Sequence, residues 1–384
     1  MSRPLLFVDH AAGVGGAENS LLLLMRHLPR ERWQPVLACS HGPVADAARV
    51  AGIETRPLSF PRLRRSPRFV LDWFSTARQL AALSRSLDVA ALYANTTRAA
   101  FYTALAARLA RRPFIWHMRD FWLSESKPAF AAPDHFLKWL LLKAATVTIA
   151  NSQAVQRQLP ASNKVTVVHN GLEIEAFDPS LDGGLFRAAF GIPSAAPVLG
   201  MVGRLRPWKR QERFLRVAQR VVEQIPHARF LIAGGSPLGG DGSFQCHLEQ
   251  MVVELKLEQA VVFSGHLDDV RPALAAMDLF VHPGDPEPFG LVNIEAMAME
   301  KAVVAFAHGA LPEIVEHKVT GLLVEPENED ALAKAIVSLL EDEPRRIKMG
   351  RAGRRRVQEQ FTIQRVASEV DHILAQAISG AVRG

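Results

Sequence analysis

Short apolar runs alternate with segments of helical spacing along the first half of the chain. The apolar runs, several of them rich in β-branched residues, occupy residues 5–9, 35–39, 89–95, 114–118, 146–152 and 165–171. Between them, segments such as "AENSLLLLMRHL" (17–28) and "AAFYTALAARLA" (99–110) place apolar residues every three or four positions, which indicates helices with one buried face. Alternating strands and helices predict a parallel sheet with helices on both faces.

The same alternation starts again in the second half. New strands are predicted at residues 198–203, 228–235, 260–266, 279–284 and 302–309. The segment 172–197 between the two series contains several Gly and Pro residues and predicts a connection. We therefore predict an α/β protein with two doubly wound (Rossmann-like) domains that face each other across a cleft, residues 1–175 and 176–361. An amphipathic segment at residues 362–378 predicts a separate final helix.

The composition is that of a soluble globular protein, because 48% of the 384 residues are apolar and 22% are charged. No apolar run reaches the roughly 18 residues that cross a bilayer, and the first residues read as a strand and not as a signal peptide. The only cysteines, Cys39 and Cys246, are far apart, which fits a reducing compartment and excludes a cysteine-based zinc site. We predict a cytoplasmic protein.

Charge is distributed unevenly between the two halves. Residues 1–175 hold 22 Lys and Arg against 12 Asp and Glu, whereas the remainder holds 23 against 27. The basic half could meet an anionic acceptor, an anionic membrane surface or nucleic acid. Since the chain has no recognised nucleic-acid motif and no basic helix with interleaved aromatic residues, we predict no nucleic-acid partner.

Ligands of open α/β sheets bind beyond the carboxyl ends of the strands, so we looked for chemistry there. The glycines Gly15 and Gly16 follow the first strand and open a helix, which is compatible with a phosphate contact and equally with a plain tight turn. Glu18 stands where the dinucleotide fingerprint has its third glycine. This segment therefore does not predict a dinucleotide site.

Two charged residues follow the first strand of the second domain, in "VGRLRPWKR" (202–210). Arg204 can grip phosphate oxygens through its fork of N–H donors, and Lys209 adds a point charge, which together suit a diphosphate. A solvated basic turn is the alternative.

The segment "PGDPEPFGLVNIEAMAMEK" (283–301) predicts a helix that begins near Phe289 and Gly290. Its first free N–H groups, those of Gly290, Leu291 and Val292, would point at an anion. Glu287, before the helix, can accept hydrogen bonds from ligand hydroxyls, and Glu295, inside it, suits a vicinal diol. The alternative is an ordinary helix with acids near its N-terminus.

His117 lies in the otherwise apolar strand "PFIWHMRD" (113–120). Taken alone, such a histidine is typical of a core residue with satisfied hydrogen bonds. By the same reading, Arg119 and Asp120 pair with one another.

Together these segments resemble the retaining glycosyltransferases of family 4, which have the two-domain GT-B fold. The resemblance is carried by "GGAE" (15–18), "VGRLRPWKR" and residues 283–326, with support from "IANS" (149–152) and "HNG" (169–171). It spans most of the chain, and the C-terminal half is the more specific.

The resemblance implies a role for each candidate residue. Arg204 and Lys209 would bind the donor diphosphate, together with the backbone amides of Phe289, Gly290, Leu291 and Val292. Glu295 would bind the ribose, and Glu287 would hold the donor-sugar hydroxyls. His117 would lie beside the sugar at the reaction centre, with Gly15 and Gly16 on the phosphates from across the cleft.

The resemblance also implies how the domains divide the work. The N-terminal domain would bind the acceptor and the C-terminal domain the donor, and the final helix would cross back so that residues 362–384 pack on the N-terminal domain. The chain departs from the family at two positions: Gly284 stands where Ser is frequent, and Lys301 follows Glu300 where Gly is usual. Both departures bear on donor identity more than on reaction type.

The resemblance implies that the chain moves a sugar from a nucleoside-diphosphate sugar, with UDP or GDP as the nucleotide, to an acceptor hydroxyl. The acceptor would be a glycan, a glycolipid or a small molecule. The reaction would retain the anomeric configuration and would need no metal or cofactor. The pair Asp268-Asp269 is not a D-x-D metal motif. The alternatives are a nucleotide-sugar epimerase of similar fold, an NAD-dependent dehydrogenase and a protein that only binds nucleotide.

Two segments bear on membranes. "FPRLRRSPRFVLDWF" (60–74) is either a solvated loop that leads into a helix or a dock for an anionic acceptor or lipid headgroup through Arg62, Arg64, Arg65 and Arg68. The second reading would place the protein peripherally at the inner face of the membrane. "HFLKWLLLKAA" (135–145) could seek a membrane, but we interpret it as a buried core helix because a strand follows it.

Overall fold

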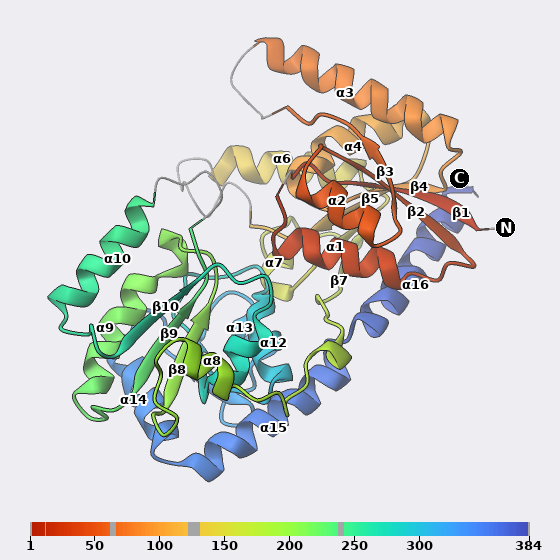
Figure 1. Cartoon of the computed structure of the whole chain (residues 1–384). Coiled ribbons are helices and arrows are strands. Elements are labelled where there is room, and N and C mark those ends of the chain that lie inside the picture. The colour runs from red at the N-terminus through yellow and green to blue at the C-terminus, as the bar shows by residue number, and fades with distance from the viewer. Residues whose placement is uncertain (1, 12, 62–66, 122–130, 237–241, 383–384) are drawn as a thin grey trace. The chain divides into compact units, whose positions relative to one another are not determined.

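The computed structural model describes residues 2–11, 13–61, 67–121, 131–236 and 242–382 (Figure 1). The chain divides into two compact units. Unit 1 comprises Met1–Leu172 and Ile363–Gly384, and unit 2 comprises Glu173–Thr362.

Unit 1 is built on a seven-stranded sheet whose strands are all parallel, in the order β3-β2-β1-β4-β5-β6-β7. The strand order reverses between β1 and β4, so the loops that follow these two strands diverge to opposite faces and leave room for a ligand. The strands are β1 (Arg3–Val8), β2 (Trp33–Cys39), β3 (Glu54–Pro57), β4 (Ala91–Ala94), β5 (Phe114–Met118), β6 (Val147–Ala150) and β7 (Val165–Val167).

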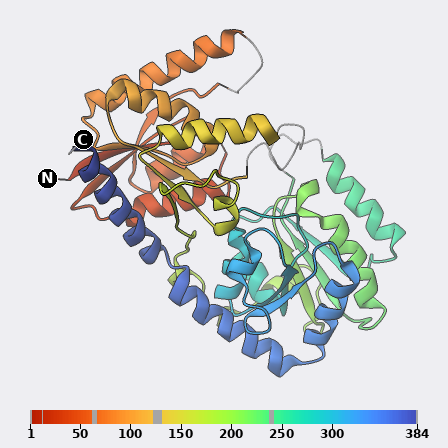
Figure 2. The same ribbon diagram turned by 180° about the vertical axis from the view of Figure 1, so that it is seen from behind.

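The final helix α16 (Ile363–Val382) belongs to unit 1 and runs beside α1 (Figure 1, Figure 2). Its Val370 and Leu374 are fully buried in the same core as Leu5 and Phe7 of β1, and Asp371 accepts hydrogen bonds from Arg32 and Trp33. The predicted return of the last helix to the N-terminal domain is confirmed. The other helices of unit 1 are α1 (Gly16–His27), α2 (Pro43–Val50), α3 (Pro67–Ser86), α4 (Thr97–Ala110), α6 (Ala131–Ala144) and α7 (Gln153–Gln156).

Unit 2 repeats the design with a six-stranded parallel sheet in the order β10-β9-β8-β11-β12-β13. Its order reverses between β8 (Val198–Val202) and β11 (Leu279–His282). The other strands are β9 (Arg229–Ala233), β10 (Val261–Gly265), β12 (Ala302–Phe306) and β13 (Gly321–Val324). The helices, including short 3-10 turns, are η2 (Ile174–Ala176), α8 (Gly184–Ala189), η3 (Pro207–Lys209), α9 (Gln211–Val222), α10 (Ser243–Glu254), α11 (Arg271–Ala276), α12 (Leu291–Ala298), α13 (Leu311–Ile314), α14 (Glu329–Leu340) and α15 (Glu343–Gln360).

The predicted class of two doubly wound parallel sheets is confirmed, but the sequence missed one strand in each sheet. Both missed strands, β3 and β13, lie at a sheet edge. An edge strand pairs on one side only and can stay short, and β13 is only the four apolar residues "GLLV". β3 reads "ETRP" and three of its four residues are exposed.

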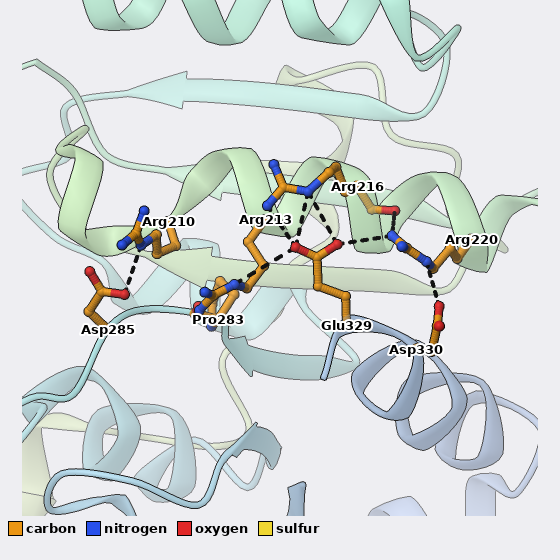
Figure 3. A network of polar contacts seen from close by, with 8 residues as sticks. All are labelled: Arg210, Arg213, Arg216, Arg220, Pro283, Asp285, Glu329 and Asp330. Carbon is orange, nitrogen blue, oxygen red and sulfur yellow. Dashed lines mark hydrogen bonds and ion pairs between the residues drawn. The ribbon is translucent and has the colours of Figure 1, made fainter. Parts of the chain in front are cut away.

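A cluster of charges joins α9 to the start of α14 in unit 2 (Figure 3). Arg216 donates to both carboxylate oxygens of Glu329 at 2.6–3.2 Å, and Arg220 donates to the same carboxylate at 3.1 Å. Arg213 lies 3.9 Å from it, and its side chain is only 9% exposed. Glu329 therefore neutralises several arginines that face one side of α9.

The Glu329→Ala variant is expected to lower the free energy of unfolding by roughly 1–3 kcal/mol, because it leaves the sheltered Arg213 without its counter-charge. The matched control is Asp330→Ala, since Asp330 is 72% exposed and pairs with Arg220 alone among the described residues. That control should cost less than about 0.5 kcal/mol. Chemical denaturation of both variants measures the difference, and equal losses would contradict the assigned role of Glu329.

Candidate functional site

The strongest candidate site lies in unit 2, where the loops after β8 and β11 meet at the point of reversed strand order. The backbone N–H of Asp285 donates to Trp208 O at 3.0 Å, and Arg210 Nε donates to the Asp285 carboxylate at 2.7 Å. These bonds hold the two loops together. The sequence-predicted residues Arg204, Lys209 and Glu287 are thereby brought to one edge of the sheet.

Lys209 and Glu287 form a direct ion pair, with side chains 14% and 9% exposed. Burial alone would raise the pKa of Glu287, but the charge of Lys209 and its hydrogen bond outweigh burial, so the pKa is lowered. Glu287 is thus an anion that accepts hydrogen bonds. It lies just before α12, and its role of holding ligand hydroxyls stays a prediction.

Two further residues lie close to Glu287, namely His282 and Asn293, and the sequence analysis did not identify them. Asn293 Nδ2 donates to Gly290 O at 2.9 Å and lies 3.3 Å from His282 Nδ1. Since the amide is the donor, Nδ1 accepts and the ring proton is on Nε2, which lies 3.7 Å from Glu287 Oε1. Burial lowers the pKa of His282 to about 4, so this ring is neutral at pH 7. The sequence feature that could have identified His282 is its position at the end of the apolar run that forms strand β11.

Glycine is required at the turn into α12. Gly290 has φ +87°, and a Cβ there would lie 2.7 Å from Asn293 Nδ2. At Gly284, where the family frequently has Ser, a Cβ would lie 3.1 Å from His282 Nε2. The departure at Gly284 therefore has a local reason, because the missing side chain leaves room for the imidazole.

The second departure, at Lys301, lies next to a backbone position that favours glycine. Glu300 has φ +57°, the left-handed conformation that favours glycine, whereas Lys301 does not. Lys301 Nζ donates to Ala275 O at 3.2 Å. The residue that replaces a favourable glycine is therefore Glu300.

Helix α12 presents Glu295 and the amides of its first turn. The side chain of Phe289 is buried and packs edge-on against Phe361, with ring centroids 5.9 Å apart, so only its backbone can face a ligand. Leu291 and Val292 are half-buried and occupy the first turn, where N–H groups have no intrahelical acceptor. This arrangement suits an anion at the start of the helix.

Glu295 is a partly buried carboxylate for which the described part of the chain provides no hydrogen-bond partner. Burial raises its pKa to about 7, although the charge of Lys209 acts in the opposite direction. A carboxylate held without a partner fits one that receives hydroxyls from a ligand. Arg204, in contrast, is exposed, and it too has no ion pair within the described ranges.

The raised pKa of Glu295 predicts a pH-dependent loss of stability. Between pH 4.5 and about 7 the unfolded state gives up this proton while the folded state keeps it, so the free energy of unfolding falls as pH rises and levels off above pH 7. The fall should be about 3 kcal/mol by linkage. Subtracting the denaturation profile of the Glu295→Gln variant isolates the effect, and parallel profiles would contradict it.

The second candidate cluster lies in unit 1 around His117, which is fully buried at the end of β5. Its Nδ1 receives hydrogen bonds from the hydroxyl of Tyr93 and from Arg119, the latter at 3.1 Å. Because a guanidinium can only donate, Nδ1 is an acceptor and the ring proton is on Nε2. Burial, reinforced by the charge of Arg119, holds the pKa of His117 well below its usual range. His117 is therefore a neutral donor whose Nε2 has no partner in the described residues.

Arg119 is held by two asparagines that the sequence analysis did not single out. Its Nε donates to Asn95 Oδ1 at 2.8 Å, and its NH1 group donates to Asn170. Asn95 in turn donates to Asp9 at 2.7 Å. These residues follow β1, β4, β5 and β7, so the cluster gathers the carboxyl ends of several strands.

Two expectations for this region are corrected. The predicted pairing of Arg119 with Asp120 is wrong, because Asp120 accepts from the hydroxyl of Thr97 at 2.8 Å instead. His117 is also not a core histidine with satisfied hydrogen bonds, since its Nε2 has no partner among the described residues.

Gly15 and Gly16 lie at the start of α1, in extended and helical backbone respectively. Their contact with phosphates stays a prediction.

Within the described ranges, no group of three or more His, Cys, Asp or Glu side chains is placed to hold a metal ion. None of the helices in the same ranges combines the length and the apolar character that crossing a bilayer requires. The predicted membrane contact through Arg62, Arg64 and Arg65 falls outside the described residues. Arg68 lies in α3, but its side chain is not described.

Two family models match the chain. One is described as Glycosyltransferase Family 4 and matches residues 14–176. The other is described as Glycosyl transferases group 1 and matches residues 184–356. Each match covers most of one half of the chain.

Curated relatives match more narrowly. A D-inositol 3-phosphate glycosyltransferase from Corynebacterium aurimucosum is 32% identical over 250 residues, which cover 62% of this chain and 59% of the relative. A GDP-mannose-dependent monoacylated alpha-(1-6)-phosphatidylinositol monomannoside mannosyltransferase from Corynebacterium glutamicum is 31% identical over 216 residues, 53% of this chain and 54% of the relative. The chain thus spans less than two thirds of the length of either relative.

Solved structures match over nearly the whole chain. The crystal structure of Anabaena HepE in complex with UDP and glucose has a TM-score of 0.84 and 26% identity, and the match covers 97% of this chain and 99% of that one. Sucrose-phosphate synthase from Thermosynechococcus elongatus has a TM-score of 0.80 at 23% identity, covering 98% of this chain and 100% of that one, and shares the fold.

Proposed function

Because the chain belongs to the family-4 glycosyltransferases, the glycosyl transferases group 1 with the GT-B fold, we propose that it transfers a sugar from a nucleoside-diphosphate sugar to an acceptor hydroxyl. One observation carries the proposal. The edge of the sheet in unit 2 gathers Arg204, the Lys209–Glu287 pair and the start of α12, which also carries Glu295. Among the described residues, Arg204 has no ion pair and Glu295 has no hydrogen-bond partner.

Each residue has a task that its geometry supports. Arg204, Lys209 and the first amides of α12 stabilise the negative charge that builds on the departing diphosphate. Glu295 takes the two ribose hydroxyls, and Glu287, kept anionic by Lys209, takes hydroxyls of the donor sugar. Catalysis by this route needs no metal ion, since the protein supplies the positive charge.

The same proposal includes retention of the anomeric configuration. The bond from the anomeric carbon to the phosphate oxygen breaks through an oxocarbenium-like transition state, and the acceptor oxygen attacks on the same face. The acceptor proton passes to the leaving phosphate. No carboxylate in this account acts as a nucleophile on the sugar. His117 donates a hydrogen bond from Nε2 to the donor sugar, as the family resemblance implies.

UDP-glucose is the first donor to test, because the HepE neighbour binds UDP and glucose. The mannosyltransferase relative uses GDP-mannose, so GDP-mannose is the second. The relatives' names also favour an inositol-containing or lipid-linked acceptor hydroxyl. The site of action would be the cytoplasm, where nucleotide sugars are available.

A thermal-shift panel of UDP, GDP, ADP and their sugars tests the donor proposal. A true donor nucleotide stabilises the folded state increasingly with the logarithm of its free concentration, by about 2.7 kcal/mol at a hundredfold excess over the dissociation constant. Donor incubated with an acceptor panel should then give a product with retained configuration by NMR. Donor alone that is isomerised would identify the epimerase alternative, and no shift with any nucleotide would overturn the proposal.

A further inference from the structure

Helix α6 of unit 1 buries an ion pair and exposes several large apolar side chains. Its charged pair, Asp134 and Lys138, is buried, with a 2.7 Å ion pair between side chains that are 3% and 1% exposed. Lys138 also donates to Phe121 O at 3.0 Å. On the opposite side, Phe136 is 57% exposed, Trp139 40% and Leu140 42%. The prediction of a buried core helix is therefore correct only for the side that carries Leu141 and Leu142.

The exposed side chains form one continuous face, because residues 136, 139, 140 and 143 follow the i, i+3, i+4, i+7 spacing of a helix. Phe136 stacks on Trp139 with ring centroids 5.9 Å apart, and Lys143 Nζ lies 5.8 Å from the centre of the Trp139 ring. The only acid of α6, Asp134, is on the buried side. We call Phe136, Trp139, Leu140 and Lys143 the aromatic face.

A second surface of the same composition lies on α3. Leu71 is 71% exposed and Phe74 43%, and the Arg78 guanidinium lies 5.7 Å from the centre of the Phe74 ring. Both α3 and α6 pack against α4. Unit 1 therefore carries two helices that each present apolar side chains with a cation beside an aromatic ring.

We propose that the aromatic face of α6 docks unit 1 onto an anionic lipid surface. Exposed Trp and Phe favour the interface between headgroups and acyl chains, and a lysine beside them can extend to lipid phosphates. The net charge of the first half of the chain also favours an anionic surface, because residues 1–175 carry 22 Lys and Arg against 12 Asp and Glu. A second copy of the chain fits less well, since a stable dimer buries about 800 Å² per partner, more than four side chains of one helix supply.

The proposal goes beyond sugar transfer and does not depend on it. If the acceptor is lipid-linked, docking would bring unit 1 to its substrate, but the docking itself requires no donor. It also differs from the arginine segment predicted from the sequence. The side chains of Phe136, Trp139, Leu140 and Lys143 are exposed, so they can be changed without disturbing the core.

Flotation of the full chain with vesicles tests the proposal. Wild type should bind vesicles of phosphatidylglycerol and phosphatidylcholine and should bind pure phosphatidylcholine much less. The Phe136→Ser/Trp139→Ser variant should partition at least about tenfold more weakly, since burial of two aromatic side chains is lost. Lys143→Ser should weaken the binding to anionic vesicles only.

The matched control is Leu185→Ser/Val253→Ser, which removes side chains that are 82% and 59% exposed in unit 2. It should float like wild type. Circular dichroism confirms that each variant is folded. Equal flotation of wild type and the aromatic variant would overturn the proposal, as would absence of binding to anionic vesicles. A dimer in analytical ultracentrifugation that the aromatic variant loses would assign the face to a second copy instead.

Discussion

Arg204→Ala is expected to slow sugar transfer roughly 10²–10³-fold in kcat, the loss that follows removal of one preorganised donor to a developing anion. Arg204 directly follows β8 and the glycine at 203, and it has no ion pair among the residues described, so its charge is available to a diphosphate. Lys209→Ala should be as damaging. It is a less clean test, however, because it also leaves the buried Glu287 without its counter-charge.

Arg206→Ala is the matched control, because Arg206 is another exposed arginine of the same loop. It lies beyond Leu205, whose side chain is buried, and it should change kcat by less than a few-fold. Steady-state kinetics with saturating donor measure all three variants. Near-normal transfer by Arg204→Ala and Lys209→Ala would show that leaving-group charge is stabilised elsewhere.

His117→Gln is expected to lower kcat by about 10²-fold while the KM for donor changes little, if the neutral Nε2–H stabilises the transition state. The donor tautomer is set by Tyr93 and Arg119, both of which direct N–H or O–H groups at Nδ1. Tyr93→Phe should therefore cost much less, because Arg119 alone still fixes the tautomer. Glutamine retains most of the volume of the ring, which limits the effect on folding.

Nitrogen NMR of the imidazole tests the assigned tautomer independently of the kinetics. In wild type and in Tyr93→Phe, the spectrum should show a protonated Nε2, unchanged from pH 6 to pH 8, because the pKa of His117 lies well below its usual range. A proton on Nδ1, or titration near pH 6.5, would contradict the assigned tautomer. Unchanged kcat in His117→Gln would remove His117 from the reaction centre.

Local sequence patterns were sufficient to predict the central strands and the loops that carry Arg204, Lys209 and Glu287. β8 and β11 are apolar runs that end in "VGR" and "VHPG", and the chemistry follows each run directly in sequence. The same holds for Glu287 and Glu295, whose separation is a property of one helix and the loop before it. The prediction failed at two edge strands for different reasons. β3 is polar and mostly exposed, whereas β13 is apolar but only four residues long, too short a run to indicate a strand by itself.

Long-range networks could not be predicted in this way. Asn95 and Asn170 hold Arg119 across 24 and 51 residues of chain. Although "HNG" (169–171) supports the family resemblance, neither segment indicates that its asparagine binds Arg119. His282 and Asn293 meet across the turn that Gly290 permits. Helix α6 shows a different limit, since "HFLKWLLLK" is apolar nearly all round and does not reveal which side is buried.

The most direct test is a crystal structure of the chain soaked with its nucleoside-diphosphate sugar. The account predicts the diphosphate within hydrogen-bond distance of the Arg204 guanidinium, Lys209 Nζ and the first amides of α12, with the ribose diol on Glu295. A diphosphate bound away from Arg204 and from the start of α12 would contradict it.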